Sequence, residues 1–374
     1  HRQPPAPGDA APVTVLGLES SCDDSAAALV RLHGDGCAEV LAETVRAQTA
    51  DHAPYGGVVP EIAARAHAEI IYRLAADVLA EASLALDDVD AVAATAGPGL
   101  IGGVMAALMT AKGLAYGSGK PLIAVNHLEG HALSPRLTER LGFPYLLLLV
   151  SGGHTQLVSV EDVGVMRRLG STIDDAAGEA FDKTAKILGL GFPGGPAVEA
   201  AAREADDPGR FGLPRMLARD PSCNLSFAGL KTAAKRAWDG LDAPGEAERN
   251  DLAAGVQAEI ARHLAERSGR AMAAFNKTHR ADAPVFVAAG GVAANAAVRN
   301  ALQSAAAEHG FTFMAPPVKY CTDNAAMIAL AGAERFRRGQ IDGLDAPARA
   351  RWPLDEDAAS ADPASGGGRK GPKA

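Results

Sequence analysis

The sequence is poor in cysteine, and its cysteines do not occur in pairs. Cys22, Cys37, Cys223 and Cys321 are the four present, and they show no Cys-x-x-Cys spacing. Without paired spacing or a disulfide framework, we expect reduced, buried thiols in a cytoplasmic protein.

Long apolar runs and an excess of positive charge are also missing. The strongest apolar run, residues 145–150, is far shorter than the roughly 18 residues of a membrane helix. The formal net charge is −9 and the pI is about 5.6, whereas a protein that wraps nucleic acid with its whole surface would be basic. We therefore predict no membrane association, and any contact with nucleic acid should use a local patch or a partner.

The chain is long enough for two lobes, with 374 residues of which 48% are hydrophobic. Its halves share one plan. An apolar strand at 13–18 runs into a small, polar and acidic turn and a second strand at 26–30. The same order of strand, turn and strand returns at 145–150 and 156–160.

This repetition predicts an α/β protein with an N-terminal lobe at 13–142 and a C-terminal lobe at 143–321. The last clear helix, within about 322–345, is expected to pack back on the first lobe. Disordered tails are predicted at 1–12 and 355–374 from their composition. The main further elements expected are helices at 60–86, with a buried face of Ile62, Ala66, Ile70, Leu74, Val78 and Ala82, at 251–275 and at 322–337, and strands at 91–95, 121–125, 285–289 and 311–314.

Two histidines have metal-ligand spacing. His127 and His131 are four residues apart, so on a helix both imidazoles lie on one face, one turn apart. Asp323, far downstream, is a carboxylate that could complete the set. His127 follows the strand at 121–125, and open α/β sheets collect ligands at such strand ends. The alternative is a pair of polar surface histidines.

Several turns offer groups to a ligand. The turn after the first strand contains Asp23, and Ser151-Gly152-Gly153-His154 leaves backbone N–H groups suited to a phosphate. Asn295 follows a third glycine pair and could hydrogen-bond a nucleoside. Each of these is an ordinary turn on the alternative interpretation. Asp182, in the middle of a helix, could simply pair with Lys186.

Taken together, the motifs resemble a known family, the universal tRNA threonylcarbamoyltransferases, called TsaD in bacteria. The resemblance covers about residues 13–354, with Ser20 where many members have threonine. The motifs that carry it are Leu18–Asp24, Asn126–His131, Val150–Thr155, Gly178–Lys183, Gly191–Pro196, Asn224–Lys231, Ala289–Asn295 and Cys321–Asn324.

The resemblance implies a two-lobed actin-like ATPase (ASKHA) fold with duplicated βββαβα-type lobes and a nucleotide cleft between them. It implies that one divalent metal, most often Fe(2+) and otherwise Zn(2+) or Mg(2+), is held by His127, His131 and Asp323. The substrate-binding residues that it implies are Val150, Ser151, Gly152, Gly153, His154, Asp182, Gly195 and Asn295.

The implied reaction transfers the threonylcarbamoyl group from L-threonylcarbamoyladenylate to N6 of adenosine-37, just 3′ of the anticodon, in tRNAs that read codons starting with A. AMP is released. Such a donor is already activated, so alignment of the weakly nucleophilic amine matters most. A carboxylate that receives the N6 proton would help. We nominate Asp23, with Glu19 as a second catalytic candidate.

Two other activities fit parts of the pattern. A glycoprotease-type metalloprotease would need His-Glu-x-x-His, but here Glu129 lies two positions after His127 instead of one. A small-molecule kinase of the same fold usually begins its first turn with Asp-x-Gly, where this chain has Glu19-Ser20-Ser21. A non-catalytic scaffold is a third alternative, and the complete metal-ligand set argues against it.

The resemblance also implies partners besides tRNA. A TsaC-type synthase must supply the adenylate, since nothing in the chain makes it. A TsaB-like paralog and a small TsaE-like ATPase act with the bacterial family. The small-residue stretch Gly102, Gly103, Ala106 and Ala107 is a predicted packing face for the paralog.

Overall fold

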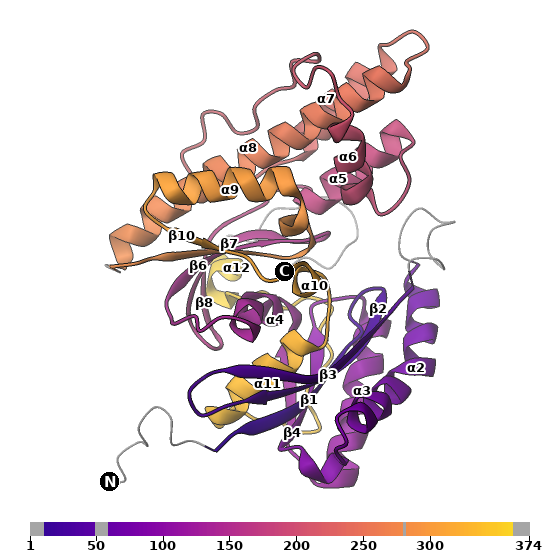
Figure 1. The fold of residues 1–374 in the computed structure, drawn as a ribbon, viewed down its shortest axis with the longest axis vertical. Coiled ribbons are helices and arrows are strands. Elements are labelled where there is room, and N and C mark those ends of the chain that lie inside the picture. The colour runs from indigo at the N-terminus through magenta and orange to yellow at the C-terminus, as the bar shows by residue number, and fades with distance from the viewer. Residues whose placement is uncertain (1–10, 49–58, 280–281, 362–374) are drawn as a thin grey trace.

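The computed structural model describes residues 11–48, 59–279 and 282–361, and the predicted N-terminal tail lies almost wholly outside them. Two five-stranded sheets, one in each half of the chain, are stacked along the long axis (Figure 1). The first has the order β3-β2-β1-β4-β5 and the second the order β10-β9-β6-β7-β8. The strands are β1 (Val13–Glu19), β2 (Asp24–Leu32), β3 (Ala38–Ala47), β4 (Ala91–Gly97), β5 (Leu122–Asn126), β6 (Tyr145–Val150), β7 (Thr155–Asp162), β8 (Val165–Ser171), β9 (Val285–Ala289) and β10 (Thr312–Met314).

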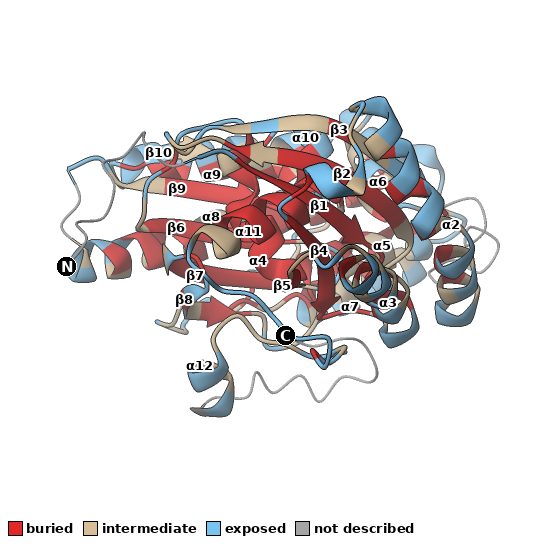
Figure 2. Cartoon of the chain, turned by 90° about the horizontal axis from the view of Figure 1, so that it is seen from below, coloured by how far each residue is buried: buried red, intermediate tan, exposed pale blue. Residues whose placement is uncertain are grey.

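Both sheets are mixed in the same way. In each, the first strand pairs antiparallel with the next one along the chain and parallel with a later strand, β4 or β9. β1 and β6 are buried along their whole length, as expected of apolar central strands covered on both faces (Figure 2). The repeated plan in the sequence is therefore a repeated sheet.

Helices cover both faces of each sheet. The longer ones are α2 (Pro60–Glu81), α3 (Ile101–Ser118), α5 (Ala177–Leu188), α6 (Gly194–Arg203), α7 (Ala228–Asp239), α8 (Glu246–Thr278), α9 (Ala296–Glu308) and α11 (Ala326–Arg337), and the short ones are α4 (His127–Leu133), α10 (Val318–Cys321) and α12 (Glu356–Ala361). No helix in the described ranges combines the length and apolar composition needed to cross a membrane.

Helices α4 and α11 lie between the two sheets and position the residues of the site. α11 packs on the inner face of the first sheet, and Leu128 and Ala132 of α4 belong to the apolar cluster under the second sheet. α2 and α3 cover the outer face of the first sheet, and α5, α8 and α9 cover that of the second. The chain thus returns through α10 and α11 to the first half after completing the second sheet (Figure 1).

Several sequence-based expectations need correction. The edge strands β3 and β8 were not predicted, because their polar and partly exposed residues conceal the strand pattern. The predicted tail from 355 starts too early, since Asp355 accepts a hydrogen bond from the Arg168 backbone and α12 follows it. Of the four free cysteines only Cys321 is buried, and Cys37 is exposed.

The buried face of α2 also differs from the prediction. Leu74 and Val78 are buried as expected, whereas Ile62 and Ile70 are only partly covered. The fully buried His67 replaces them near the centre, where its ring bonds to Ser25 Oγ at 2.7 Å and to the Cys22 carbonyl at 3.0 Å. A hydrophobic periodicity cannot reveal a histidine that is buried because its hydrogen bonds are satisfied.

The small residues of α3 are divided between the interior and the surface of the protein. A Cβ on Gly103 would lie 2.4 Å from the Ser20 carbonyl oxygen, and the fully buried Ala107 donates its N–H to Ser20 Oγ. Gly102 is exposed and Ala106 is partly exposed. Gly103 and Ala107 therefore pack within the chain, and the paralog face stays a prediction for Gly102 and Ala106.

Candidate metal centre

The two histidines are fixed by the junction between β5 and α4. Asn126 ends the strand and caps the helix, accepting the Leu128 N–H at 2.9 Å. His127 and His131 then lie on one face, with ring centroids 4.7 Å apart and ring planes perpendicular. Gly130 between them packs closely against α11, since a Cβ there would lie 2.8 Å from Ile328 Cδ1 and that side chain would have to shift.

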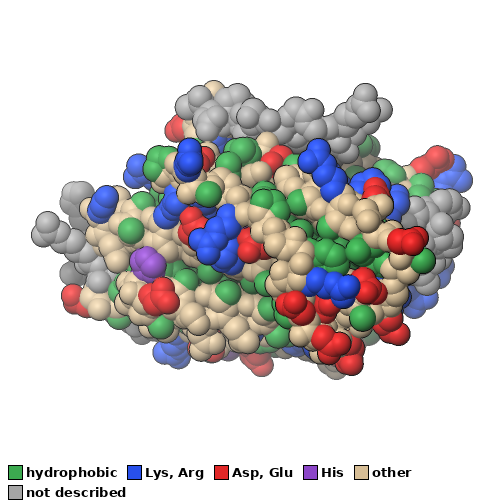
Figure 3. Space-filling view, turned by 90° about the horizontal axis from the view of Figure 1, so that it is seen from above, with side chains coloured by type: hydrophobic (Ala, Val, Ile, Leu, Met, Phe, Trp, Pro, Cys, Tyr) green, Lys and Arg blue, Asp and Glu red, His purple; other side chains and the backbone are tan. Residues whose placement is uncertain are grey.

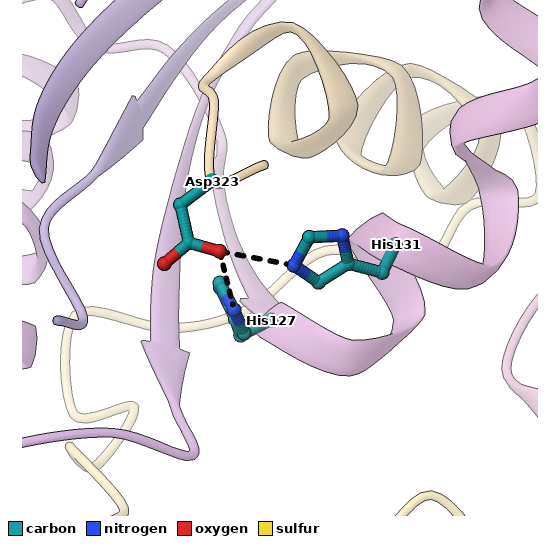
Figure 4. Close-up of side chains that lie close together, drawn as sticks. All are labelled: His127, His131 and Asp323. Atoms are coloured by element: carbon teal, nitrogen blue, oxygen red, sulfur yellow. Dashed lines mark hydrogen bonds and ion pairs between the residues drawn. The ribbon is translucent and has the colours of Figure 1, made fainter. Parts of the chain in front are cut away.

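Asp323 reaches the same point from the connection between α10 and α11. Its Oδ1 lies 3.1 Å from His131 Nε2 and 3.3 Å from His127 Nε2 (Figure 4). The ligand atoms of the three residues all lie within 4.8 Å of one another. Residues nearly 200 positions apart in the chain therefore converge as predicted, in an arrangement that could hold one divalent metal.

Glu19 orients the first of these histidines. The Glu19 Oε2 lies 2.9 Å from His127 Nδ1 and also accepts a bond from the Thr95 hydroxyl, while Oε1 accepts the Ser21 N–H at 2.6 Å. Glu19 is fully buried. A carboxylate engaged on both oxygens and hidden from solvent holds a ligand in place and does not meet a substrate, so the catalytic nomination of Glu19 is not supported by its position.

The charges around the cluster shift the pKa values of its members. Burial opposes protonation of His127, yet the carboxylates of Glu19 and Asp323 raise its pKa well above the ordinary value. Burial also opposes ionisation of Asp323, but the two histidines hold its pKa well below the usual range. The site therefore favours positive charge between its ligand atoms, as a metal site does.

The donor set fits a divalent transition metal. Two imidazole nitrogens and one carboxylate oxygen on one side of the ion are typical of such centres, and the Glu19–His127 bond is the usual carboxylate–histidine support. The Asp323 side chain is 24% exposed, which leaves an approach to the site. His131 departs from the pattern, because its Nδ1 is buried with no hydrogen-bond partner among the described residues.

We expect Glu19→Gln to weaken metal binding by roughly 10–100-fold, because the amide cannot provide the charge that supports His127. Competition with a chelator, followed by metal analysis, measures the change. Glu81→Gln, at the exposed C-terminal end of α2, serves as the control and should bind metal as the wild type does. Unchanged metal affinity in Glu19→Gln would contradict the orienting role.

The predicted substrate turn, Val150–His154, is tight and closes on itself. The Ser151 N–H donates to the His154 carbonyl at 2.8 Å, and the His154 N–H donates to Ser151 Oγ at 3.2 Å. Gly152 and Gly153 at its tip are exposed, and a Cβ on either would meet nothing. Their backbone groups are accessible, as the prediction of a phosphate-binding turn requires.

Two further glycines allow this turn to pack closely. A Cβ on Gly178, in the first turn of α5, would lie 2.5 Å from the Gly152 Cα. A Cβ on Gly290, which has a φ of +104°, would lie 2.4 Å from the Val150 carbonyl oxygen. Three glycine-containing segments predicted separately therefore meet at one place.

His154 lies within electrostatic reach of the metal ligands. Its Nε2 is buried and has no hydrogen-bond partner in the described part of the chain. Burial, reinforced by the His127 and His131 rings, lowers its pKa to about 3. A neutral imidazole with an unused nitrogen beside the cluster could bind a substrate group.

Asp182 has a partner that the sequence did not suggest. Its Oδ1 accepts the Gly194 N–H at the start of α6, at 2.9 Å, so it does not depend on Lys186. Burial raises the pKa of Asp182 and the Gly194 bond partly offsets this. Gly195, next to it, is partly exposed with open space around its Cα.

Asn295 takes part in local structure. Its Oδ1 caps α9 through the Val298 N–H at 3.0 Å, and its Nδ2 donates to Gln257 Oε1 at 2.8 Å. The second Nδ2 N–H is not used by these bonds, but Asn295 is only 6% exposed, so contact with a nucleoside would require a local shift. Its predicted substrate role therefore rests on the resemblance.

Asp24 is the first residue of β2 and Asp23 lies in the turn just before it. Both are partly exposed. Burial, followed by the negative charges of Asp23, Asp323 and Glu19, raises the pKa of Asp24 to about 7. The sequence nominated only Asp23, and no signal short of the three-dimensional arrangement could have indicated that Asp24 is surrounded by carboxylates.

Glu129 faces away from the metal ligands. It is 1% exposed, and the Arg335 Nε and Nη2 donate to its Oε2 at 2.9 and 2.7 Å. The glutamate of a zincin helix must reach a metal-bound water. The paired, buried Glu129 cannot play this part, which removes the structural basis for a metalloprotease.

The fold and the position of the site are sufficient to assign the protein to a structural class. Two mixed sheets with helices on both faces and a functional cluster between them are those of the actin-like ATPase (ASKHA) class. HypF from T. kodakarensis shares the fold, with a TM-score of 0.56 and 12% identity over 89% of this chain and 50% of that chain. HypF in its phosphate- and nucleotide-bound form gives a TM-score of 0.56 and 11% identity, over 88% of this chain and 47% of that one.

Sequence comparison resolves the family within this class. The model of the tRNA N6-adenosine threonylcarbamoyltransferases matches residues 39–330. The enzyme of that name from Maricaulis maris is 67% identical, covering 97% of this chain and 96% of its own length. That from Caulobacter vibrioides is 58% identical, covering 96% and 97%. The chain belongs to the tRNA N6-adenosine threonylcarbamoyltransferase family, and the predicted transferase class is confirmed.

Proposed function

We propose that this protein transfers the threonylcarbamoyl group from L-threonylcarbamoyladenylate to N6 of adenosine-37 in tRNAs that read codons starting with A, and releases AMP. The observation that carries the proposal is the convergence of His127, His131 and Asp323 in a member of this family. Its tRNA substrate places the reaction in the cytoplasm.

The residues of the chain have distinct parts in this proposal. The exposed Gly152–Gly153 backbone binds the phosphate of the adenylate, and Asp182, Gly195 and Asn295 contact the rest of the donor. His154 remains neutral and offers Nε2 to the same molecule. These contacts align the donor with the adenine amine, and alignment can lower a barrier by about 7–11 kcal/mol.

The three metal ligands contribute to the reaction through the charge of the metal that they would hold. The chemistry that a divalent metal provides at such a site is Lewis-acid polarisation of carbonyl or phosphate oxygens. We propose iron as the metal, with zinc and magnesium as alternatives. The two imidazoles favour the transition metals over magnesium, which prefers oxygen ligands.

Reconstitution tests the function directly. The protein is mixed with a TsaC-type synthase, TsaB-like and TsaE-like partners, threonine, bicarbonate, ATP and unmodified tRNA. Mass spectrometry of the digested tRNA should then show threonylcarbamoyladenosine. Absence of the product with active partners would contradict the proposal, and phosphorylation of a small molecule from ATP without tRNA would favour the kinase alternative.

The distribution of charge on the surface supports the proposal that tRNA binding requires partner proteins. Figure 3 shows lysine, arginine, aspartate and glutamate side chains interspersed on the face seen from the α8–α9 side, without a continuous basic field. Phosphate-backbone contacts depend on clustered positive charge. We therefore propose that tRNA binds this protein together with its TsaB-like and TsaE-like partners.

The outward side of α3 is the proposed contact for the paralog. Ile101, Met105 and Met109 follow one another at helical spacing and are 45–47% exposed, and Tyr116 near the end of the helix is 79% exposed. A row of large apolar side chains in contact with water is typical of an interaction surface. It adds larger side chains to the face that the sequence suggested, of which Gly102 is exposed and Ala106 partly exposed.

We expect Met105→Arg to weaken the heterodimer by about 30-fold or more, because a charge would be buried at the centre of an apolar contact. Analytical ultracentrifugation with the TsaB-like paralog measures the change. Val318→Arg, a substitution at a similarly exposed apolar residue on α10, should leave the heterodimer intact. Equal binding by both variants would rule out the α3 surface.

A further inference from the structure

A cavity lies behind α4, on the side away from the metal cluster. Its volume is about 410 Å³, within the range of small-molecule sites. Glu129 points into this side of the helix because it is two residues from each histidine. The cavity is lined by Asn126, Glu129, Gly164, Val165, Met166, Arg335 and residues 352–357.

Glu129 at the inner wall has an unused acceptor. Both Arg335 donors bind its Oε2, and its Oε1 is buried without a hydrogen-bond partner among the described residues. Gly164, in the same wall, lies beside this oxygen, since a Cβ there would be 3.9 Å from it. A buried carboxylate oxygen without a donor is costly, so a donor at this position would stabilise the site.

The mouth of the cavity is also negative. Asp355, Glu356 and Asp357 line it, whereas Arg335 is the one cation in the lining and is already paired. Asp355 accepts two backbone N–H groups and Glu356 pairs with Arg349 at 3.3 Å. Asp357 is exposed and forms no ion pair within the described ranges.

Apolar side chains complete the walls. Trp352, Met166 and Leu354 also line the cavity. The Arg349 guanidinium lies over the Trp352 ring, 4.8 Å from its centroid, so the indole serves here as an apolar wall that accepts methylene groups. Anionic or purely apolar ligands would leave Glu129 Oε1 and the exposed Asp357 without a donor.

We propose that this cavity binds a small aliphatic diamine. One ammonium group donates to Glu129 Oε1, the second lies near Asp357 at the mouth, and the carbon chain passes along Trp352. This site is separate from the metal cluster, and its existence does not depend on the proposed transfer reaction.

Trp352 provides the test. The chain has two tryptophans, so Trp238→Phe leaves Trp352 as the sole indole reporter. Titration with 1,4-diaminobutane at constant ionic strength should change its fluorescence saturably and give a matching calorimetric isotherm. Butane-1,4-diol, which has the same length without charge, should do neither.

Two exposed positions supply matched variants in the Trp238→Phe background. Val165→Arg places a cation at the cavity wall and should weaken diamine binding by about tenfold or more. Ile341→Arg, a change of the same kind at a similarly exposed residue outside the lining, should not. Asp357→Asn, on the exposed rim, should weaken binding about threefold.

The proposal is overturned if neither fluorescence nor heat shows saturable binding of the diamine. Equal binding of butane-1,4-diol, or undiminished affinity in both Val165→Arg and Asp357→Asn, also overturns it. The oligomeric state and the circular dichroism of each variant confirm that folding is retained.

Discussion

Asp323→Asn is expected to remove the bound metal and to lower threonylcarbamoyl transfer by more than the 10–100-fold that is roughly typical of losing a neighbour of a ligand. The Oδ1 atom of Asp323 is the point at which both imidazoles converge, and an amide supplies no charge to balance the ion. Metal content per chain and the yield of threonylcarbamoyladenosine are the two measurements.

A control variant distinguishes loss of the metal from a general loss of stability. Asp77→Asn, at an exposed position on α2, should retain both metal and activity. The circular dichroism of Asp323→Asn must match that of the wild type, because this variant removes a charge from a buried cluster. Wild-type activity in an Asp323→Asn protein that contains no metal would overturn the role of the cluster.

The convergence of the three predicted metal ligands agrees with the sequence analysis, in which the two histidines have a local signal. Once residues 127–133 form a helix, the four-residue spacing alone brings His127 and His131 to the same face, whatever packs against it. The adjacent glycines likewise favour a turn at 151–154. Gly130 in the histidine motif allows close packing on α11, which the sequence alone does not reveal.

What the sequence could not supply was contact between distant polar groups. Nothing in the order of residues pairs Glu19 with His127, Asp182 with Gly194, or Glu129 with Arg335. In the sequence, polar side chains at such positions resemble turn or surface residues. In the folded protein they are buried away from water and therefore need a hydrogen-bond partner. The buried His67 was missed for the same reason.

Asp23→Asn is expected to lower the rate of transfer by about 100-fold or more if this carboxylate receives the N6 proton, since general bases contribute about that much. Metal content and affinity for the donor and tRNA should stay at the wild-type level, because Asp23 is partly exposed and bonds to none of the three ligands in the described structure. Single-turnover transfer to tRNA, with donor in excess, is the measurement.

Asp24 is the matched comparison, because it adjoins Asp23 and has the same side chain. Its pKa of about 7 means that it is partly protonated at neutral pH, so a rate that depended on ionised Asp24 would rise as the pH increases through that value. If Asp23 is the base, Asp24→Asn keeps most of the activity. The opposite result would be an Asp24→Asn protein without transfer activity beside an Asp23→Asn protein of normal activity. In that case the nomination of Asp23 is wrong, and Asp24 receives the proton.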